Sequence, residues 1–117
     1  MKMNQKIKKR WIKKLNDPSM KQHKGKLRSV KGNSFCCLGV LCEVYREDHP
    51  ETKWDKQNNK FLYQSDILPN EVINWAELDS CDPNIFVNSE WEFNSLSELN
   101  DKGTPFKEIA KLINKSL

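Results

Sequence analysis

Histidine and glycine are scarce in this chain, and long apolar runs are absent. Two histidines and four glycines occur among its 117 residues. No apolar stretch approaches the ~20 residues that a membrane-spanning helix needs, and no glycine-rich phosphate loop is present. These absences argue against a membrane partner and against histidine-based catalysis. We expect a protein that is not an enzyme and that carries no cofactor and no metal.

The four cysteines, at positions 36, 37, 42 and 81, do not form a pattern typical of disulfides or of zinc sites. Adjacent Cys36 and Cys37 are poorly placed to bond to each other, and the paired spacing of structural zinc ligands is missing. The basic N-terminal residues lead into an amphipathic stretch rather than an apolar one, which argues against a secretory signal. We therefore expect reduced, buried thiols and a cytoplasmic protein.

Charge is distributed unevenly along the chain, whose formal net charge is +4. Residues 1–31 contain ten lysines and two arginines against a single carboxylate, Asp17, which gives +11, whereas the remainder carries −7. This segregation indicates either a basic face offered to an anionic partner or a basic segment that lies on the protein's own acidic body.

Hydrophobic spacing predicts two main helices in the first half of the chain. Apolar residues recur every four positions over 4–15, which predicts an amphipathic helix. An apolar run over 35–46, with Ser34 as its cap, predicts a central buried helix, and Gly39 inside it indicates close packing of another element. The core of this helix is expected to include Cys37, Leu38, Leu41 and Cys42.

The second half of the chain contains signals for shorter elements. They predict a short hairpin around 57–60, a helix that starts at Pro69, a strand over 85–87, a short helix opened by a capping box at Ser95, and a last helix capped by Thr104 and started by Pro105. The predicted fold is α+β, a small single domain over 1–117. Its central buried cysteine-rich helix is joined by three or four further helices and a short β-hairpin or small antiparallel sheet.

Two motifs stand out, Cys-Cys-Leu-Gly-Val-Leu-Cys at 36–42 and Leu-Asn-Asp-x-Gly-x-x-Phe-x-x-Ile-Ala at 99–110. Together with Gln22 and Gly25 before the cysteine block, they resemble a family of small proteins common in tailed phages, over nearly the whole chain. The resemblance implies a phage origin and an accessory role in the cytoplasm of the infected host cell. It supplies no reaction, and the high lysine content before the cysteine block departs from the family.

Two other functions can be weighed against simpler interpretations. A cysteine nucleophile at the start of the cysteine helix would need a histidine base, but His49 would lie roughly 15–20 Å away. Buried structural thiols are favoured. Residues 96–113 resemble the entry to a helix-turn-helix, but 114–117 are too few for a recognition helix, so a packed αα-hairpin is favoured.

The basic connection between the two predicted helices is the candidate binding site. Its side chains can present several cations to phosphates, and its glycine adds flexible backbone amides. The alternatives are a solvated face or lysines that lie on the acidic remainder of the chain. We predict an anion-binding surface made by Lys21, Gln22, Lys24, Gly25, Lys26 and Arg28.

These observations favour a phage accessory protein that acts by stoichiometric binding, most naturally in counter-defence. Such a protein would sequester an anionic nucleotide-type signal or block a host protein. A nucleic-acid-binding accessory protein is the alternative, and a small cysteine-dependent enzyme is third. Four tryptophans and five phenylalanines can leave apolar surface exposed, so a homo-oligomer is also compatible with the sequence.

Overall fold

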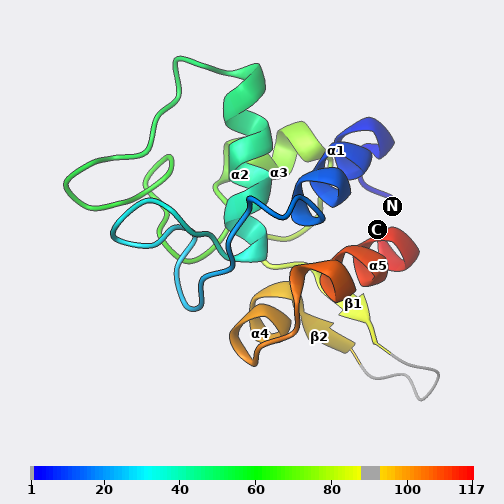
Figure 1. Cartoon of the computed structure of the whole chain (residues 1–117). Helices are drawn as coiled ribbons and strands as arrows, with labels where there is room; N and C mark the ends of the chain where they lie inside the picture. The colour runs from blue at the N-terminus through cyan, green and yellow to red at the C-terminus, as the bar shows by residue number, and fades with distance from the viewer. Residues whose placement is uncertain (1, 88–92) are drawn as a thin grey trace.

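Five helices and one pair of short strands occur within residues 2–87 and 93–117, the part of the chain that the structure describes. In the computed structural model these elements are α1 (Gln5–Leu15), α2 (Cys37–Asp48), α3 (Asn70–Ala76), β1 (Asn84–Phe86), β2 (Phe93–Ser95), α4 (Leu96–Asp101) and α5 (Phe106–Ser116). The two strands pair antiparallel. Figure 1 shows α2 near the centre, α1 beside α5, and the strands next to α5. The α+β fold with a buried cysteine-rich helix is confirmed.

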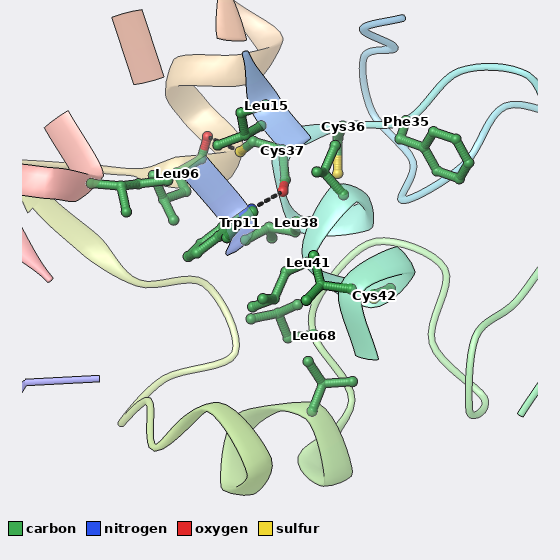
Figure 2. Close-up of a cluster of buried hydrophobic side chains, with 14 of the residues drawn as sticks. Trp11, Leu15, Phe35, Cys36, Cys37, Leu38, Leu41, Cys42, Leu68 and Leu96 are labelled. Carbon is green, nitrogen blue, oxygen red and sulfur yellow. Dashed lines mark hydrogen bonds between the residues drawn. The ribbon is translucent and has the colours of Figure 1, made fainter. Parts of the chain in front are cut away.

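α1 follows the predicted spacing and begins one residue later than predicted. The side chain of its N-cap, Asn4, accepts a hydrogen bond from the Ile7 N–H at 3.0 Å. Trp11 is fully buried, and its Nε1 donates to the Cys37 carbonyl at 3.0 Å. Figure 2 shows this bond among the buried side chains of the core. Burial and one buried hydrogen bond therefore hold the apolar face of α1 against the first turn of α2.

α2 begins at Cys37, two residues later than predicted, and its N-cap is Cys36 rather than Ser34. The backbone of Phe35 is already paired with the connection that follows α1, since its N–H donates to the Lys21 carbonyl at 2.9 Å. Backbone held in an extended bridge cannot also form the first helical turn. The predicted core residues are all fully buried, namely Cys37, Leu38, Leu41 and Cys42.

Gly39 lets the connection cross α2 at close range. A Cβ atom at this position would lie 2.7 Å from the Leu27 carbonyl carbon, which is closer than real Cβ atoms approach other atoms. Leu27 is fully buried, and its backbone is bonded on both sides, to the Ser65 carbonyl at 2.7 Å and to the Cys36 N–H at 3.2 Å. The close packing predicted from Gly39 is confirmed, and the packed element is an extended segment.

The C-terminal elements agree with the sequence pattern except at three points. Ser95 caps α4 as predicted, because its hydroxyl oxygen accepts a hydrogen bond from the Glu98 N–H at 3.3 Å. Thr104 does not cap α5, which begins after Pro105 without a side-chain cap. The predicted strand is β1, displaced by one residue, whereas its partner β2 was not predicted because it is short and largely polar.

The prediction of a hairpin around residues 57–60 is wrong. The backbones of Phe61 and Gln64 exchange hydrogen bonds of 2.8 and 3.0 Å, but they form an isolated bridge within a series of turns. Leu62 and Tyr63 between them have positive φ angles, 47° and 74°, which a continuous strand does not accommodate. The antiparallel pair lies at β1 and β2 instead.

α1 and α5, the first and last helices, lie side by side and run in opposite directions (Figure 1). The two ends of the chain are therefore close together, and the Lys8 ammonium lies 3.4 Å from the Asn114 carbonyl oxygen. Among the described residues, no helix combines the length and the apolar character that spanning a membrane requires.

Candidate functional site

A groove of about 760 Å³ lies between α1 and α5 and extends along the connection that follows α1. Its floor is apolar, because Phe106 and Ala110 of α5 are buried there and Ile12 and Met20 are half-buried. The volume falls within the ~300–1,000 Å³ that is usual for ligand sites. The groove thus offers an apolar surface that is open to a ligand or partner.

Four lysines line this groove, two from each helix. Lys9 and Lys13 belong to α1, Lys107 and Lys111 belong to α5, and within each pair the residues are one helical turn apart. All four are exposed, and among the described residues only Lys111 has a carboxylate within 4.0 Å, that of Glu108. Like charges at this spacing destabilise a helix by about 0.2–0.5 kcal/mol per pair. Helix stability therefore does not explain the pair on α1, and on α5 the contact of Lys111 with Glu108 at most offsets the repulsion.

One carboxylate lines the groove, that of Asp17 just after α1. It accepts hydrogen bonds from the backbone N–H and the hydroxyl of Ser19, at 2.9 and 2.8 Å. These bonds lower the pKa of the Asp17 carboxyl, so it is ionised at neutral pH. The groove still carries a positive excess, which matches an anionic occupant.

Two other cations of α1, Arg10 and Lys14, are paired with carboxylates of α2. Arg10 lies 2.8 Å from Asp48 and 3.3 Å from Glu47, and Lys14 lies 3.0 Å from Glu47. The hydrogen bond from Arg10 lowers the pKa of the Asp48 carboxyl. Part of the basic N-terminal charge therefore lies on acidic residues of α2, as one of the two sequence alternatives predicted.

Two residues of the predicted binding surface attach the connection to α4 and the turn after it. The amide of Gln22 donates to Asn100 Oδ1 at 2.9 Å and to the Thr104 carbonyl at 2.8 Å. The Gly25 N–H donates to the Asp101 carboxylate at 2.9 Å, and its φ of 86° is one that glycine adopts without strain. These contacts give both residues a structural role.

The cations of the predicted surface point to different neighbours. Lys26 lies 3.1 Å from Asp66, with both side chains more than half exposed. The Arg28 guanidinium lies over the Trp54 ring, 5.3 Å from its centroid. These two contacts hold the end of the connection against the loops that follow α2.

Lys21 and Lys24 have exposed side chains. Of the six predicted residues, Gln22 lines the groove between α1 and α5, and Arg28 lines a separate cavity. The structure therefore does not bring the six together at one site. Anion binding by the segment as a whole stays a prediction.

Asn100 organises this region, although sequence reasoning did not single it out. It is fully buried, and besides the Gln22 amide its Oδ1 accepts the Cys37 N–H at 3.1 Å. Its Nδ2 donates to the His23 carbonyl at 2.7 Å. One amide thus joins α4, the start of α2 and the connection. The available signal was the place of Asn100 in the Leu-Asn-Asp motif at 99–101, directly after an apolar residue.

The cysteines have the properties of core groups. Burial raises the pKa of the Cys36 thiol to about 11, although the thiol accepts a hydrogen bond from the Gly39 N–H. Burial raises the pKa values of Cys37 and Cys42 well above the ordinary value. All four cysteines are free. At neutral pH the three buried thiols are protonated, which favours the structural interpretation over a nucleophile.

Within the ranges that the structure describes, no group of three His, Cys, Asp or Glu is placed to hold a metal ion. His49 packs instead in an aromatic cluster, with its ring stacked on Tyr45 at 3.9 Å between centroids and Trp75 near both. α4 and α5 pack against each other, as expected for the αα-hairpin that was favoured over a helix-turn-helix. The groove is therefore the strongest candidate for a binding site.

Sequence reasoning missed the lysines of the groove. It located the basic excess in residues 1–31 and did not consider Lys107 and Lys111, because the remainder of the chain is acidic overall. The signal that could have found them is the repeated four-residue lysine spacing in two amphipathic helices. Knowing that the two helices are neighbours requires the tertiary structure.

The fold and the groove define a small α+β domain with a cationic, apolar-floored surface. Residues 3–117 match the family described as Domain of unknown function (DUF8296), and the chain belongs to that family. No curated protein and no solved structure matches the chain.

Proposed function

We propose that this protein is a phage accessory protein that acts in counter-defence by stoichiometric binding of a host protein. An acidic amphipathic segment of that partner occupies the groove between α1 and α5. The phage setting rests on the sequence motifs alone. The chemistry of the partner is supported by one observation, the placement of a lysine pair on each helix beside a shared apolar floor.

An amphipathic helix has the complementary arrangement. Its apolar face can cover Ile12 and Met20, and acidic residues on its two flanks can reach the lysines of α1 and α5. Residues one turn apart on a helix are about 6 Å apart along its axis. A bound helix with acidic residues one turn apart therefore matches the spacing within each lysine pair.

A nucleotide-type signal is the alternative occupant, and the volume of the groove would admit one. Its negative charge is concentrated on the phosphates, so it is best bound by cations that converge on one point. The lysines of the groove are divided between two helices. A nucleic acid would use the lysines but would gain little from the apolar floor. The arrangement favours the amphipathic partner over both.

The test is calorimetric titration with a helical peptide that has leucines on one face and glutamates on both flanks. We expect one peptide per protein molecule and an affinity that falls as salt increases. The variant Lys107→Gln/Lys111→Gln should bind about tenfold more weakly, since exposed charge contacts contribute about 0.2–1 kcal/mol each.

The control peptide has the same composition in a scrambled order without an apolar face, and it should bind much more weakly. Equal binding of the two peptides would show that charge alone is recognised and would contradict the proposal. A nucleoside triphosphate that binds tightly to the wild type and is lost in Lys107→Gln/Lys111→Gln, with no binding of either peptide, would favour the nucleotide alternative.

A further inference from the structure

Arg28 has an environment that its structural contacts do not fully explain. Its guanidinium lies between the Trp54 ring and the backbone of Gly32, where a Cβ atom would lie 2.8 Å from the guanidinium carbon. Among the described residues, Arg28 Nε is the one buried side-chain nitrogen or oxygen that has no hydrogen-bond partner. A buried donor on a cation is costly to leave without an acceptor.

Arg28 lines a cavity of about 440 Å³ that also contains three other cations. Lys53 and Lys56 come from the loop after α2, and Arg46 comes from α2 itself. Among the described residues, no carboxylate lies within 4 Å of Arg28, Lys53 or Lys56. The cavity therefore gathers cations from three segments of the chain.

The one carboxylate of the cavity, Glu43, is already engaged. Arg46 holds it through two bonds of 2.8 and 3.0 Å, and Trp54 Nε1 donates to it at 2.9 Å. Burial raises the pKa of the Glu43 carboxyl, but these hydrogen bonds outweigh burial and leave the pKa below its ordinary value. Glu43 thus neutralises Arg46 and leaves the other three cations unmatched.

We infer that this cavity binds the phosphate group of a small phosphorylated ligand. Arginine presents a planar set of donors that fits phosphate oxygens, and the two lysines can add charge from the loop. The cavity is large enough for a phosphate ester rather than the free ion alone. It shares no residue with the groove between α1 and α5, so the inference does not rest on the proposed function.

The experiment is a titration of the ¹⁵N-labelled protein with inorganic phosphate and then pyrophosphate, followed by NMR at the Nε–H signal of Arg28. We expect a saturable shift of that signal and of the Trp54 indole N–H, with tighter binding of pyrophosphate. Arg28→Lys should weaken pyrophosphate binding about tenfold, because the planar donor set is lost while the charge is kept. Lys102→Gln, at an exposed position outside the cavity, should leave the affinity unchanged.

Lys53→Gln/Lys56→Gln provides a second test that leaves the core intact, because both side chains are exposed. It too should weaken pyrophosphate binding about tenfold. An unmoved Arg28 signal, or equal affinities in wild type and these variants, would overturn the inference. So would acetate shifting the signal as strongly as phosphate. Lys9→Gln/Lys13→Gln should not affect this titration, which separates a failure here from a failure of the groove proposal.

Discussion

Four of the cations of α1 form two groups with different contacts, although the groups alternate along the same helix. Arg10 and Lys14 lie within 2.8–3.3 Å of carboxylates on α2. Lys9 and Lys13 line the groove and have no carboxylate within 4 Å among the described residues. The first group joins two helices, and the second faces an open apolar surface. The position of acidic residues in other elements, rather than the local sequence, separates the two groups.

Substitutions in the core around α2, the helix that Arg10 and Lys14 contact, should lower the stability of the protein. The largest effect is expected for Gly39→Ala, because the added Cβ would collide with the Leu27 backbone. Backbone cannot move aside as a side chain can, so we expect a loss of about 3 kcal/mol or more in the free energy of unfolding. Urea unfolding followed by circular dichroism measures it.

Gly25→Ala is the matched control for that substitution. No heavy atom lies within 4 Å of a Cβ added at Gly25, so the substitution introduces only left-handed backbone strain, about 1–2 kcal/mol. If Gly39→Ala is no more destabilising than Gly25→Ala, the close contact between α2 and the connection is not rigid, and this account of the core is wrong.

The next largest effect is expected for Asn100→Ala. The substitution leaves the Cys37 N–H and the His23 carbonyl without their bonds to the amide. Buried polar groups without partners cost about 1–3 kcal/mol each, so we expect a loss of about 2–4 kcal/mol. Asn70→Ala, at an exposed position, should change stability by less than about 0.5 kcal/mol. Similar results for the two variants would contradict the role of Asn100.

A third prediction concerns alkaline pH. The Cys36 thiol has a folded-state pKa of about 11, against 9.0 ordinarily, so the unfolded chain releases this proton first as pH rises. Its contribution to stability is fully present below about pH 9 and is lost as pH rises towards 11. Cys36→Ala should show a shallower decline of stability over this window. Parallel declines in variant and wild type would mean that the thiol is not buried.

The smallest expected stability effects are those of the two groups on α1. Arg10→Gln/Lys14→Gln removes partly exposed ion pairs and should lower stability by about 0.5–1 kcal/mol. Lys9→Gln/Lys13→Gln removes a like-charge pair and should raise stability by a few tenths of a kcal/mol, about 0.2–0.5. Differential scanning calorimetry at low salt measures both. Equal destabilisation by the two variants would contradict the claim that, of these four cations, only Arg10 and Lys14 form stabilising ion pairs with the described residues.

The sequence predicted the elements whose signals are local. Apolar spacing located α1, and the capping box at Ser95 located α4. The start of α2 and the hairpin around 57–60 were predicted wrongly. Neither the pairing of Phe35 with the connection nor the positive φ angles of Leu62 and Tyr63 can be inferred from the spacing of apolar residues. Contacts and backbone angles set by the folded structure determine where α2 begins and why no hairpin forms around 57–60.

The candidate site was less predictable than the fold. Composition directed attention to the connection, where Gln22 and Gly25 turn out to hold it against α4 and the turn that follows. The groove depends on α1 and α5 being neighbours, and they are far apart in the sequence. A charge count also cannot tell Lys9 from Arg10, because only the fold places Glu47 beside one of them.

The most direct measurement compares peptide affinity in the two α1 double variants. Each variant is titrated calorimetrically with the acidic amphipathic peptide, and each removes two cations from the same helix, so long-range charge effects are matched. Lys9→Gln/Lys13→Gln should bind about tenfold more weakly than wild type, while Arg10→Gln/Lys14→Gln should bind as wild type does. Equal losses in the two variants would show that overall charge is recognised rather than the groove, and would contradict the account.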